Sequence, residues 1–266
     1  MTKRVISAIV ALLILVPIIL KGGWLFNLVA YIIALLGLKE FIDAKSKKKP
    51  VPFIIGLMAY IFISLIILVD VTSSSTLFSL DFRVIAALFI AFLLPVVLYH
   101  DQKKYSITDA FYMLGGVLFL GISMALLIML RYIDLKIFVF LFTITITTDV
   151  FAYLTGLLIG KHKLLPEISP KKTWEGLIGG TIMGVFVSSM FYVTCIDPNI
   201  SILVLVASCT FLSLLGQFGD LVFSAMKRYF GIKDFSGIMP GHGGVLDRLD
   251  SIIFVVLGFV FFINIL

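Results

Sequence analysis

The chain has 266 residues, of which 61% are hydrophobic and only 14% are charged. Soluble domains are closer to half apolar and a quarter charged, so one core of this size cannot hide the excess. The composition excludes an ordinary soluble domain and predicts a multi-pass membrane protein. The formal net charge is +6. No basic surface with exposed aromatic residues stands free of the apolar stretches, so nucleic acid is not an expected partner.

Nine apolar stretches follow one another along the chain. Each is near the length of about 20 residues that a helix needs to cross a bilayer. Membrane strands would alternate polar and apolar residues, whereas these stretches are apolar all round, so we expect an all-α membrane protein. The stretches are Val5–Leu20, Trp24–Leu38, Val51–Val71, Val84–Tyr99, Ile107–Leu130, Leu135–Ile159, Gly176–Ile196, Ile200–Phe223 and Ser251–Leu266.

The basic residues predict an orientation. Most of the 21 Lys and Arg fall between alternate spans on one side, including the KSKKKP run at Lys45–Pro50. The positive-inside rule makes this side cytoplasmic, with the N-terminus inside and the C-terminus outside. The run itself is either a topology anchor or a contact with anionic lipid. The MTKR start lacks a small-x-small cleavage site, so we expect the first helix to be retained.

The two parts of the chain differ in their polar residues. Residues 1–134 are chemically quiet and are expected to serve as scaffold, in dimer contacts or in lipid contacts. Residues 135–266 hold nearly all the unusual polar groups and are expected to be the catalytic region. Cys195 and Cys209 have no metal-type spacing and are interpreted as small apolar residues.

Asp149 lies inside the sixth span, with Tyr153 at i+4 and Gly156 at i+7. An ionised carboxylate at that depth needs water, a cation or a partner. Asp149 and Tyr153 are therefore expected to line a polar cavity open to the cytoplasm. The alternative is a hydrogen-bonded Asp that packs between helices.

The loop GKHKLLPEISPKKTWEG, Gly160 to Gly176, gathers four Lys and one His. Ser169-Pro170 is expected to form a turn, and Thr173 with the residues after it to start the next helix. Lys171 and Lys172 either bind phosphate or only anchor the topology.

Gly176, Gly180 and Gly184 repeat every four residues. This spacing predicts a stripe of small residues for close helix packing, which also permits a homodimer.

The stretch from Ser224 to Asp250, SAMKRYFGIKDFSGIMPGHGGVLDRLD, carries the most chemistry. Charges beside a bilayer are costly and seldom idle. If the eighth helix continues into this stretch, one face carries a carboxylate, a hydroxyl and two cations. These are Asp220, Ser224, Lys227 and Arg228. Such a row can hold a divalent metal and the phosphates that it bridges.

Asp247 and Asp250 lie one helical turn apart at the start of the ninth helix. Acids cap helix N-termini, but we favour a metal site formed with Asp220. Arg248 between them can bind a phosphate through two hydrogen bonds. Backbone N–H groups of the PGHGG turn, Pro240 to Gly244, can approach a phosphate closely. No Walker pattern is present in the sequence.

The C-terminal stretch also resembles the signature of the phosphatidate cytidylyltransferases, or CDP-diacylglycerol synthases. The matching positions are Ser224, Met226, Lys227, Arg228, Lys233, Asp234, His242, Gly243, Gly244, Val245, Asp247, Arg248, Leu249 and Asp250. Further similar positions are Gly219-Asp220-Leu221, Asp149, Ala152-Tyr153, Gly160-Lys161 and Ser169 to Gly176. Met239 departs from the family pattern, where Leu, Ile or Phe is more frequent. The resemblance covers roughly residues 140–255.

The resemblance implies the reaction of CTP with phosphatidate to give CDP-diacylglycerol and pyrophosphate in phospholipid biosynthesis. It also implies Mg²⁺, with room for a second cation, and a multi-pass enzyme of the cytoplasmic (inner) membrane whose active site faces the cytoplasm. Metal binding is then assigned to Asp220, Asp247 and Asp250. The catalytic residues would be Lys227, Arg228, Asp247, Asp250 and His242, where His242 orients a phosphate oxygen or caps the loop. Phosphate-binding roles fall to Ser224, Lys233, Arg248, Lys171, Lys172, Ser169, Gly243 and Gly244.

Two alternatives remain open at the level of the sequence. A CTP-dependent kinase of a lipid alcohol would use the same metal and basic loops but would release CDP. An ion-coupled transporter would use Asp149 as an ion site, although transporters place polar groups near the midplane in repeated halves.

Overall fold

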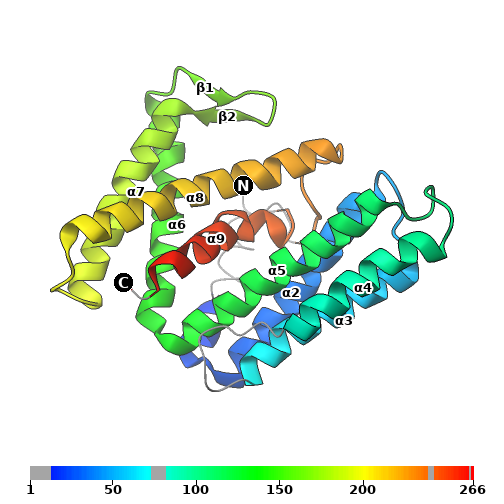
Figure 1. Cartoon of the computed structure of the whole chain (residues 1–266). Coiled ribbons are helices and arrows are strands. Elements are labelled where there is room, and N and C mark those ends of the chain that lie inside the picture. The colour runs from blue at the N-terminus through cyan, green and yellow to red at the C-terminus, as the bar shows by residue number, and fades with distance from the viewer. Residues whose placement is uncertain (1–12, 73–81, 239–242, 264) are drawn as a thin grey trace. The chain divides into compact units, whose positions relative to one another are not determined.

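The computed structural model describes residues 13–72, 82–238, 243–263 and 265–266. Helices dominate it, and they form two compact units that are described separately (Figure 1). The first unit holds the described residues up to Tyr132 together with Phe230–Asp247. The second unit comprises Ile133–Tyr229 and Arg248–Leu266. The functional division predicted between residues 1–134 and 135–266 stays a prediction.

In the first unit, residues 13–21 are helical and four longer helices follow. Their bounds are α2 Gly23–Ser46, α3 Phe53–Thr72, α4 Phe82–Leu98 and α5 Ile107–Ile133. The core of the unit forms around α5, where Met113, Val117, Leu120, Met124 and Ile128 are each at most 2% exposed. Their spacing of three and four residues places them on one helical face, as expected for a helix packed among neighbours.

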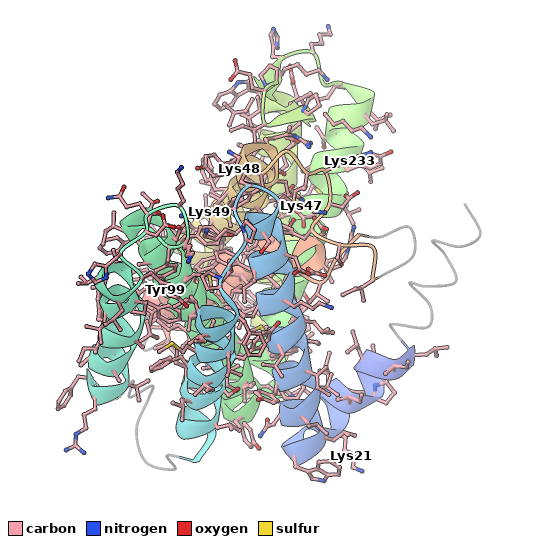
Figure 2. All side chains as sticks on the ribbon, turned by 90° about the vertical axis from the view of Figure 1, so that its right-hand side faces the viewer. Lys21, Lys47, Lys48, Lys49, Tyr99 and Lys233 are labelled. Atoms are coloured by element: carbon pink, nitrogen blue, oxygen red, sulfur yellow. The ribbon has the colours of Figure 1, made fainter. Side chains whose placement is uncertain are left out.

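Figure 2 shows Lys47, Lys48, Lys49 and Lys233 at one end of the helices of this unit and Lys21 at the other. Because Lys21 and Lys47 flank α2 directly, the basic residues mark both ends of one apolar helix. This is the pattern of a helix that spans a membrane, where Lys side chains reach the interfaces.

The second unit contains three long helices, a hairpin and the end of the chain. The helices are α6 Leu135–Leu158, α7 Trp174–Cys195 and α8 Ile202–Tyr229. The hairpin between α6 and α7 consists of β1 Lys163–Leu165 and β2 Ser169–Thr173, which pair antiparallel. Helix α9, Leu246–Phe259, starts at the end of the first unit and continues into the second, where the 3₁₀ turn η1 Val260–Phe262 follows it.

The glycine stripe is confirmed as a packing surface. Helices α6 and α7 run side by side (Figure 1). A Cβ atom on Gly180 would lie only 2.7 Å from the backbone oxygen of Thr148 on α6. The opposite face of α7 is apolar and more than half exposed at Ile178, Phe186 and Met190. One face therefore permits close helix packing, and the other suits contact with lipid.

Of two predictions made for the residues before α7, one is confirmed and the other is wrong. Thr173 is the N-cap of α7, and its hydroxyl accepts a hydrogen bond from the N–H of Gly176 at 3.1 Å, so this prediction is confirmed. The turn predicted at Ser169-Pro170 is wrong, because both residues belong to β2 and the turn lies at residues 166–168. Proline fits there because β2 is one strand of a two-stranded sheet and has an unpaired edge.

Among the helices that the structure describes, five are long and apolar enough to cross a membrane: α2, α5, α6, α7 and α8. The apolar parts of α3 and α4, Phe53–Leu68 and Phe82–Leu98, are shorter. The length and apolar composition of these helices support a membrane protein, whereas the number of membrane crossings, including the nine predicted spans, and their orientation stay predictions. The first predicted span falls mostly on residues that the structure does not describe.

Candidate functional site

A cluster of charged residues lies where β2 meets the C-terminal half of α8 in the second unit. The ammonium of Lys172 forms an ion pair with Oδ2 of Asp220 at 2.8 Å and donates to the backbone oxygen of Gln217 at 3.1 Å. The hydroxyl of Ser224 donates to Oδ1 of Asp220 at 3.3 Å. Both side chains of the ion pair are partly exposed, so a ligand can reach the pair and replace one of its two partners.

Helix α8 continues unbroken to Tyr229, as the spacing of its polar residues requires. Asp220, Ser224, Lys227 and Arg228 therefore belong to one helix. Lys227 is buried, although it carries a charge. The Nε of Arg228 donates to the backbone oxygen of Ile168 in the hairpin turn at 3.3 Å, so the hairpin is attached to α8 at two points.

Two further carboxylates belong to this cluster. Asp149 on α6 hydrogen-bonds with the side chain of Ser251 and interacts electrostatically with Asp220 and Lys172. Asp250 on α9 interacts electrostatically with Asp220, Asp149 and Lys227. Like charges repel, so three carboxylates that sense one another need cations or protons nearby. Lys172 and Lys227 supply part of that positive charge.

Gln217 is a member of this site that the sequence interpretation missed. Its buried side-chain amide donates to Oγ1 of Thr181 at 2.9 Å and to the backbone oxygen of Leu177 at 3.3 Å, both on α7. Its backbone oxygen receives the ammonium of Lys172. Gln217 thus connects α7, α8 and the hairpin lysine. A polar residue inside an apolar helix is a general signal for such a contact.

Other predicted residues of the second unit differ in how exposed they are. Lys171 is exposed, because neighbouring side chains of a strand point to opposite faces and Lys172 occupies the face toward α8. Tyr153 is 67% exposed. Ser169 is half-buried in β2, and Arg248 is exposed at the start of α9.

In the first unit, Asp247 fastens the segment that leads into α9. Its Oδ2 accepts the backbone N–H of Phe235 at 2.9 Å and that of Gly244 at 2.8 Å. A Cβ on Gly243 would lie 2.7 Å from the same oxygen. Asp247 lies in the first turn of α9, but both of these donors precede the helix. The capping role that the sequence left open for this acid and its role as a metal ligand therefore both stay predictions. Lys233 is exposed in this segment, and His242 lies outside the described residues.

Within the described ranges, no group of three or more His, Cys, Asp and Glu side chains has the arrangement needed to hold a metal ion. The predicted set of Asp220, Asp247 and Asp250 therefore remains a prediction.

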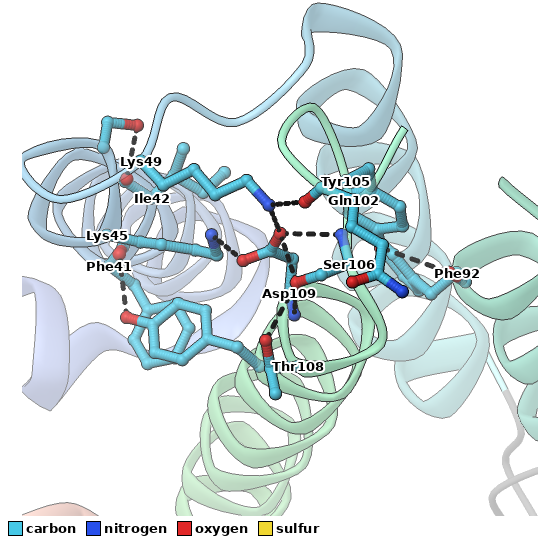
Figure 3. A network of polar contacts seen from close by, with 12 residues as sticks. Phe41, Ile42, Lys45, Lys49, Phe92, Gln102, Tyr105, Ser106, Thr108 and Asp109 are labelled. Carbon is cyan, nitrogen blue, oxygen red and sulfur yellow. Dashed lines mark hydrogen bonds and ion pairs between the residues drawn. The ribbon is translucent and has the colours of Figure 1, made fainter. Parts of the chain in front are cut away.

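The first unit also contains a buried ion network that the sequence interpretation did not foresee (Figure 3). Asp109, in the first turn of α5, pairs with Lys45 at 2.6 Å and also with Lys49. Its Oδ2 accepts the N–H and the hydroxyl of Ser106, both at 2.8 Å. Lys45, in the last turn of α2, and Lys49, just after that helix, belong to the basic run Lys45–Pro50, so part of this run is structural.

Tyr105 lies beside this network and is also buried. Burial and the negative charge of Asp109 raise the pKa of Tyr105, so its hydroxyl stays protonated. The hydroxyl donates to the backbone oxygen of Phe92 at 3.2 Å and fixes the loop before α5.

These features define an integral membrane protein with a charged site built on the ends of its helices. A sequence model of the Cytidylyltransferase family matches residues 2–266. Relatives named phosphatidate cytidylyltransferase are 39% identical over 259 residues in Staphylococcus haemolyticus and 37% identical over 257 residues in Staphylococcus saprophyticus. A third, from Staphylococcus aureus, is 38% identical over 265 residues. In each case the alignment covers 96% of both chains.

The chain therefore belongs to the cytidylyltransferase family and is a transferase of the membrane. The resemblance noted from the C-terminal motifs is confirmed and extends over nearly the whole chain. The alternatives of a lipid-alcohol kinase and of an ion-coupled transporter gain no support from these matches.

Proposed function

We propose that this protein converts CTP and phosphatidate to CDP-diacylglycerol and pyrophosphate, a step of phospholipid biosynthesis. The observation that carries the proposal is the match to relatives of that name over 96% of both chains at 37–39% identity. The charged cluster on β2 and α8 supports it, because a reaction between two phosphate anions needs cations close to carboxylates that can hold a metal.

The chemistry is a displacement at phosphorus. A phosphate oxygen of phosphatidate attacks the α-phosphorus of CTP and forms a new P–O bond. The bond from that phosphorus to the oxygen bridging to the β-phosphate breaks, and pyrophosphate leaves with the electron pair. The attacking group is already an anion, so no strong general base is required. Lysine and arginine side chains would stabilise the charge that grows on the leaving group.

In this proposal Lys172, Lys227 and Arg228 bind phosphate oxygens. The Lys172–Asp220 ion pair supports this role, because an incoming phosphate can replace the carboxylate as the partner of the ammonium. Additional contacts to phosphate are proposed for a larger set of predicted residues. These are Ser169, Lys171, Ser224, Lys233, His242, Gly243, Gly244 and Arg248.

Magnesium is the proposed cofactor, with room for a second cation. Carboxylate oxygens and phosphate oxygens are the ligands that Mg²⁺ prefers. Asp220 and Asp250 are carboxylates of one electrostatically linked cluster and fit that donor set, with Asp247 as the third predicted ligand. When bound, the metal would act as a Lewis acid on the phosphate oxygens. Lys172 and Ser224 would orient the carboxylate of Asp220.

We also propose that the site faces the cytoplasm, in the cytoplasmic membrane of a bacterium. The asymmetry of Lys and Arg supports this orientation. A polar cavity lined by Asp149 and Tyr153 would admit CTP, and phosphatidate would enter from the bilayer with its tails in lipid. The glycine face of α7 is occupied by α6 within the chain, so a homodimer would use another surface.

The experiment uses purified protein in detergent with phosphatidate, labelled CTP and Mg²⁺. Lipid-extractable cytidine label and pyrophosphate are followed together, with and without EDTA. We expect both products in equal amounts and the loss of both with EDTA, restored by excess Mg²⁺. Release of CDP in place of pyrophosphate, or no product with active lipid present, would refute the proposal.

A further inference from the structure

Glu40 is a buried acid on α2, within residues 1–134, for which the sequence predicted no catalytic residues. Its side chain is surrounded by donors from the segment before α9, all within the first unit. The Oε1 atom accepts the hydroxyl of Ser236 at 2.5 Å and the N–H of Val245 at 2.8 Å. The Oε2 atom accepts the N–H of Leu246 at 2.8 Å. Glu40 itself is only 1% exposed.

The position of Glu40 on its helix makes these contacts informative. Glu40 lies near the C-terminus of α2, which ends at Ser46. Burial of a carboxylate away from water is costly unless it is hydrogen-bonded. Three donors from a segment about 200 residues away in sequence compensate for that cost. The acid is therefore placed to hold that segment, and α2 itself does not need it.

Glu40 and Asp247 together hold the beginning and the end of the segment between α8 and α9, which contains part of the family signature. Asp247 holds the N–H groups of Phe235 and Gly244, while Glu40 holds Ser236 and Val245. Each carboxylate thus ties the beginning of the loop to its end. A Cβ on Gly244 would lie 2.5 Å from both carboxylate oxygens of Glu40, so a larger residue there would displace this carboxylate.

The contact with Leu246 matters most for the site. Leu246 is the first residue of α9, so Glu40 caps the N-terminus of this helix. Asp247, Arg248 and Asp250 project from the same helical turn. A shift of that turn would move all three side chains at once.

We propose that Glu40 is a positioning residue for the transferase reaction, which sets residues 235–238, residues 243–245 and the first turn of α9 through its buried carboxylate. It does not touch substrate and acts through the residues of α9. The inference rests on the proposed function for its activity readout, but the loop contacts stand without it.

Glu40→Gln is the sharpest test, because it keeps the shape but replaces an acceptor oxygen with an NH₂ group that faces N–H donors. We expect kcat to fall about 10- to 100-fold, the range found when a group that orients metal-binding side chains is removed. The KM for CTP should stay within about threefold of wild type, because phosphate-binding residues outside the loop are retained. Hydrogen exchange of a peptide covering residues 243–249 should accelerate about tenfold or more.

Asp109→Asn is the matched control, because Asp109 is another buried acid of the same unit and holds other segments. At a temperature where both variants are folded, Asp109→Asn should keep its kcat and normal exchange in residues 243–249. Ser236→Ala removes one donor and should give an intermediate loss if Glu40→Gln does not fold. Glu40→Asp keeps the charge and should recover part of the activity.

Four results would decide against or separate the proposals. If hydrogen exchange of residues 243–249 in Glu40→Gln is as slow as in wild type, the positioning role is overturned. Fast exchange of these residues together with a wild-type kcat would overturn it as well. An equal loss of kcat in Asp109→Asn would show general destabilisation and also overturn it. If hydrogen exchange is fast in Glu40→Gln but the wild-type protein makes no CDP-diacylglycerol, the proposed reaction is refuted. The structural role of Glu40 in holding the segment before α9 is then still supported.

Discussion

Substitution of Gly219 by alanine tests how closely α8 and α9 pack beside the charged cluster. The new Cβ would lie 2.6 Å from the backbone oxygen of Asp250 and 2.8 Å from Cδ2 of Phe254. Ordinary contact begins at 3.4 Å, so the two helices must separate by about 0.8 Å. The atom in the way belongs to the backbone and cannot rotate aside. Overpacking of this kind costs about 1–3 kcal/mol, of which better helix propensity returns about 0.5–1 kcal/mol.

We expect the apparent Tm of Gly219→Ala in detergent to fall by roughly 1–8 °C, from a net cost of about 0.5–2 kcal/mol at about 2–4 °C per kcal/mol. Activity should fall about 100-fold, because the displaced backbone is that of Asp250 and a misplacement near 1 Å costs about that factor. Gly115→Ala is the control, since nothing lies within 4 Å of its Cβ in α5, and it should keep both Tm and activity. Wild-type Tm and turnover in Gly219→Ala would refute the close contact.

Two further substitutions test ion pairs. Lys172→Gln should lower kcat/KM at least about tenfold while leaving Tm nearly unchanged, because a partly exposed pair contributes little stability. Lys163→Gln, in the other strand of the hairpin, is the control and should leave activity unchanged. Equal activity of the two variants would argue against a role for Lys172. Asp109→Asn should lower the free energy of unfolding by about 3–5 kcal/mol because it leaves Lys45 buried without its anion. Replacing both partners by Leu and Met should cost less in the same melting assay, and a double variant less stable than the single one would contradict this reasoning.

Much of the helical architecture follows from local sequence. Long apolar stretches must become helices in lipid, because every backbone polar group has to be satisfied within the segment. The stripe of Gly176, Gly180 and Gly184 predicted close packing, and α7 does lie against α6 there. The Thr173 cap was predictable because the accepting hydroxyl and the N–H that donates to it are three residues apart.

The hairpin was missed for a physical reason. Ser169-Pro170 has the composition of a turn, but strand pairing with Lys163–Leu165 moves the turn to residues 166–168. Pairing is a contact between segments, which local propensity does not contain. The polar face of α8 was expected only if the helix continued beyond its apolar part, and it does continue to Tyr229.

The sequence by itself determined that the chain is a helical membrane protein, where its basic residues gather and which motifs carry its chemistry. These properties depend on composition and on spacing along one segment. Only the tertiary structure decided which carboxylates serve which loops. Glu40 and Ser236 are 196 residues apart, and Lys45 and Asp109 are 64 residues apart. No repeating pattern in one amino-acid sequence relates positions so far apart, so their pairing can be seen only in the packed helices.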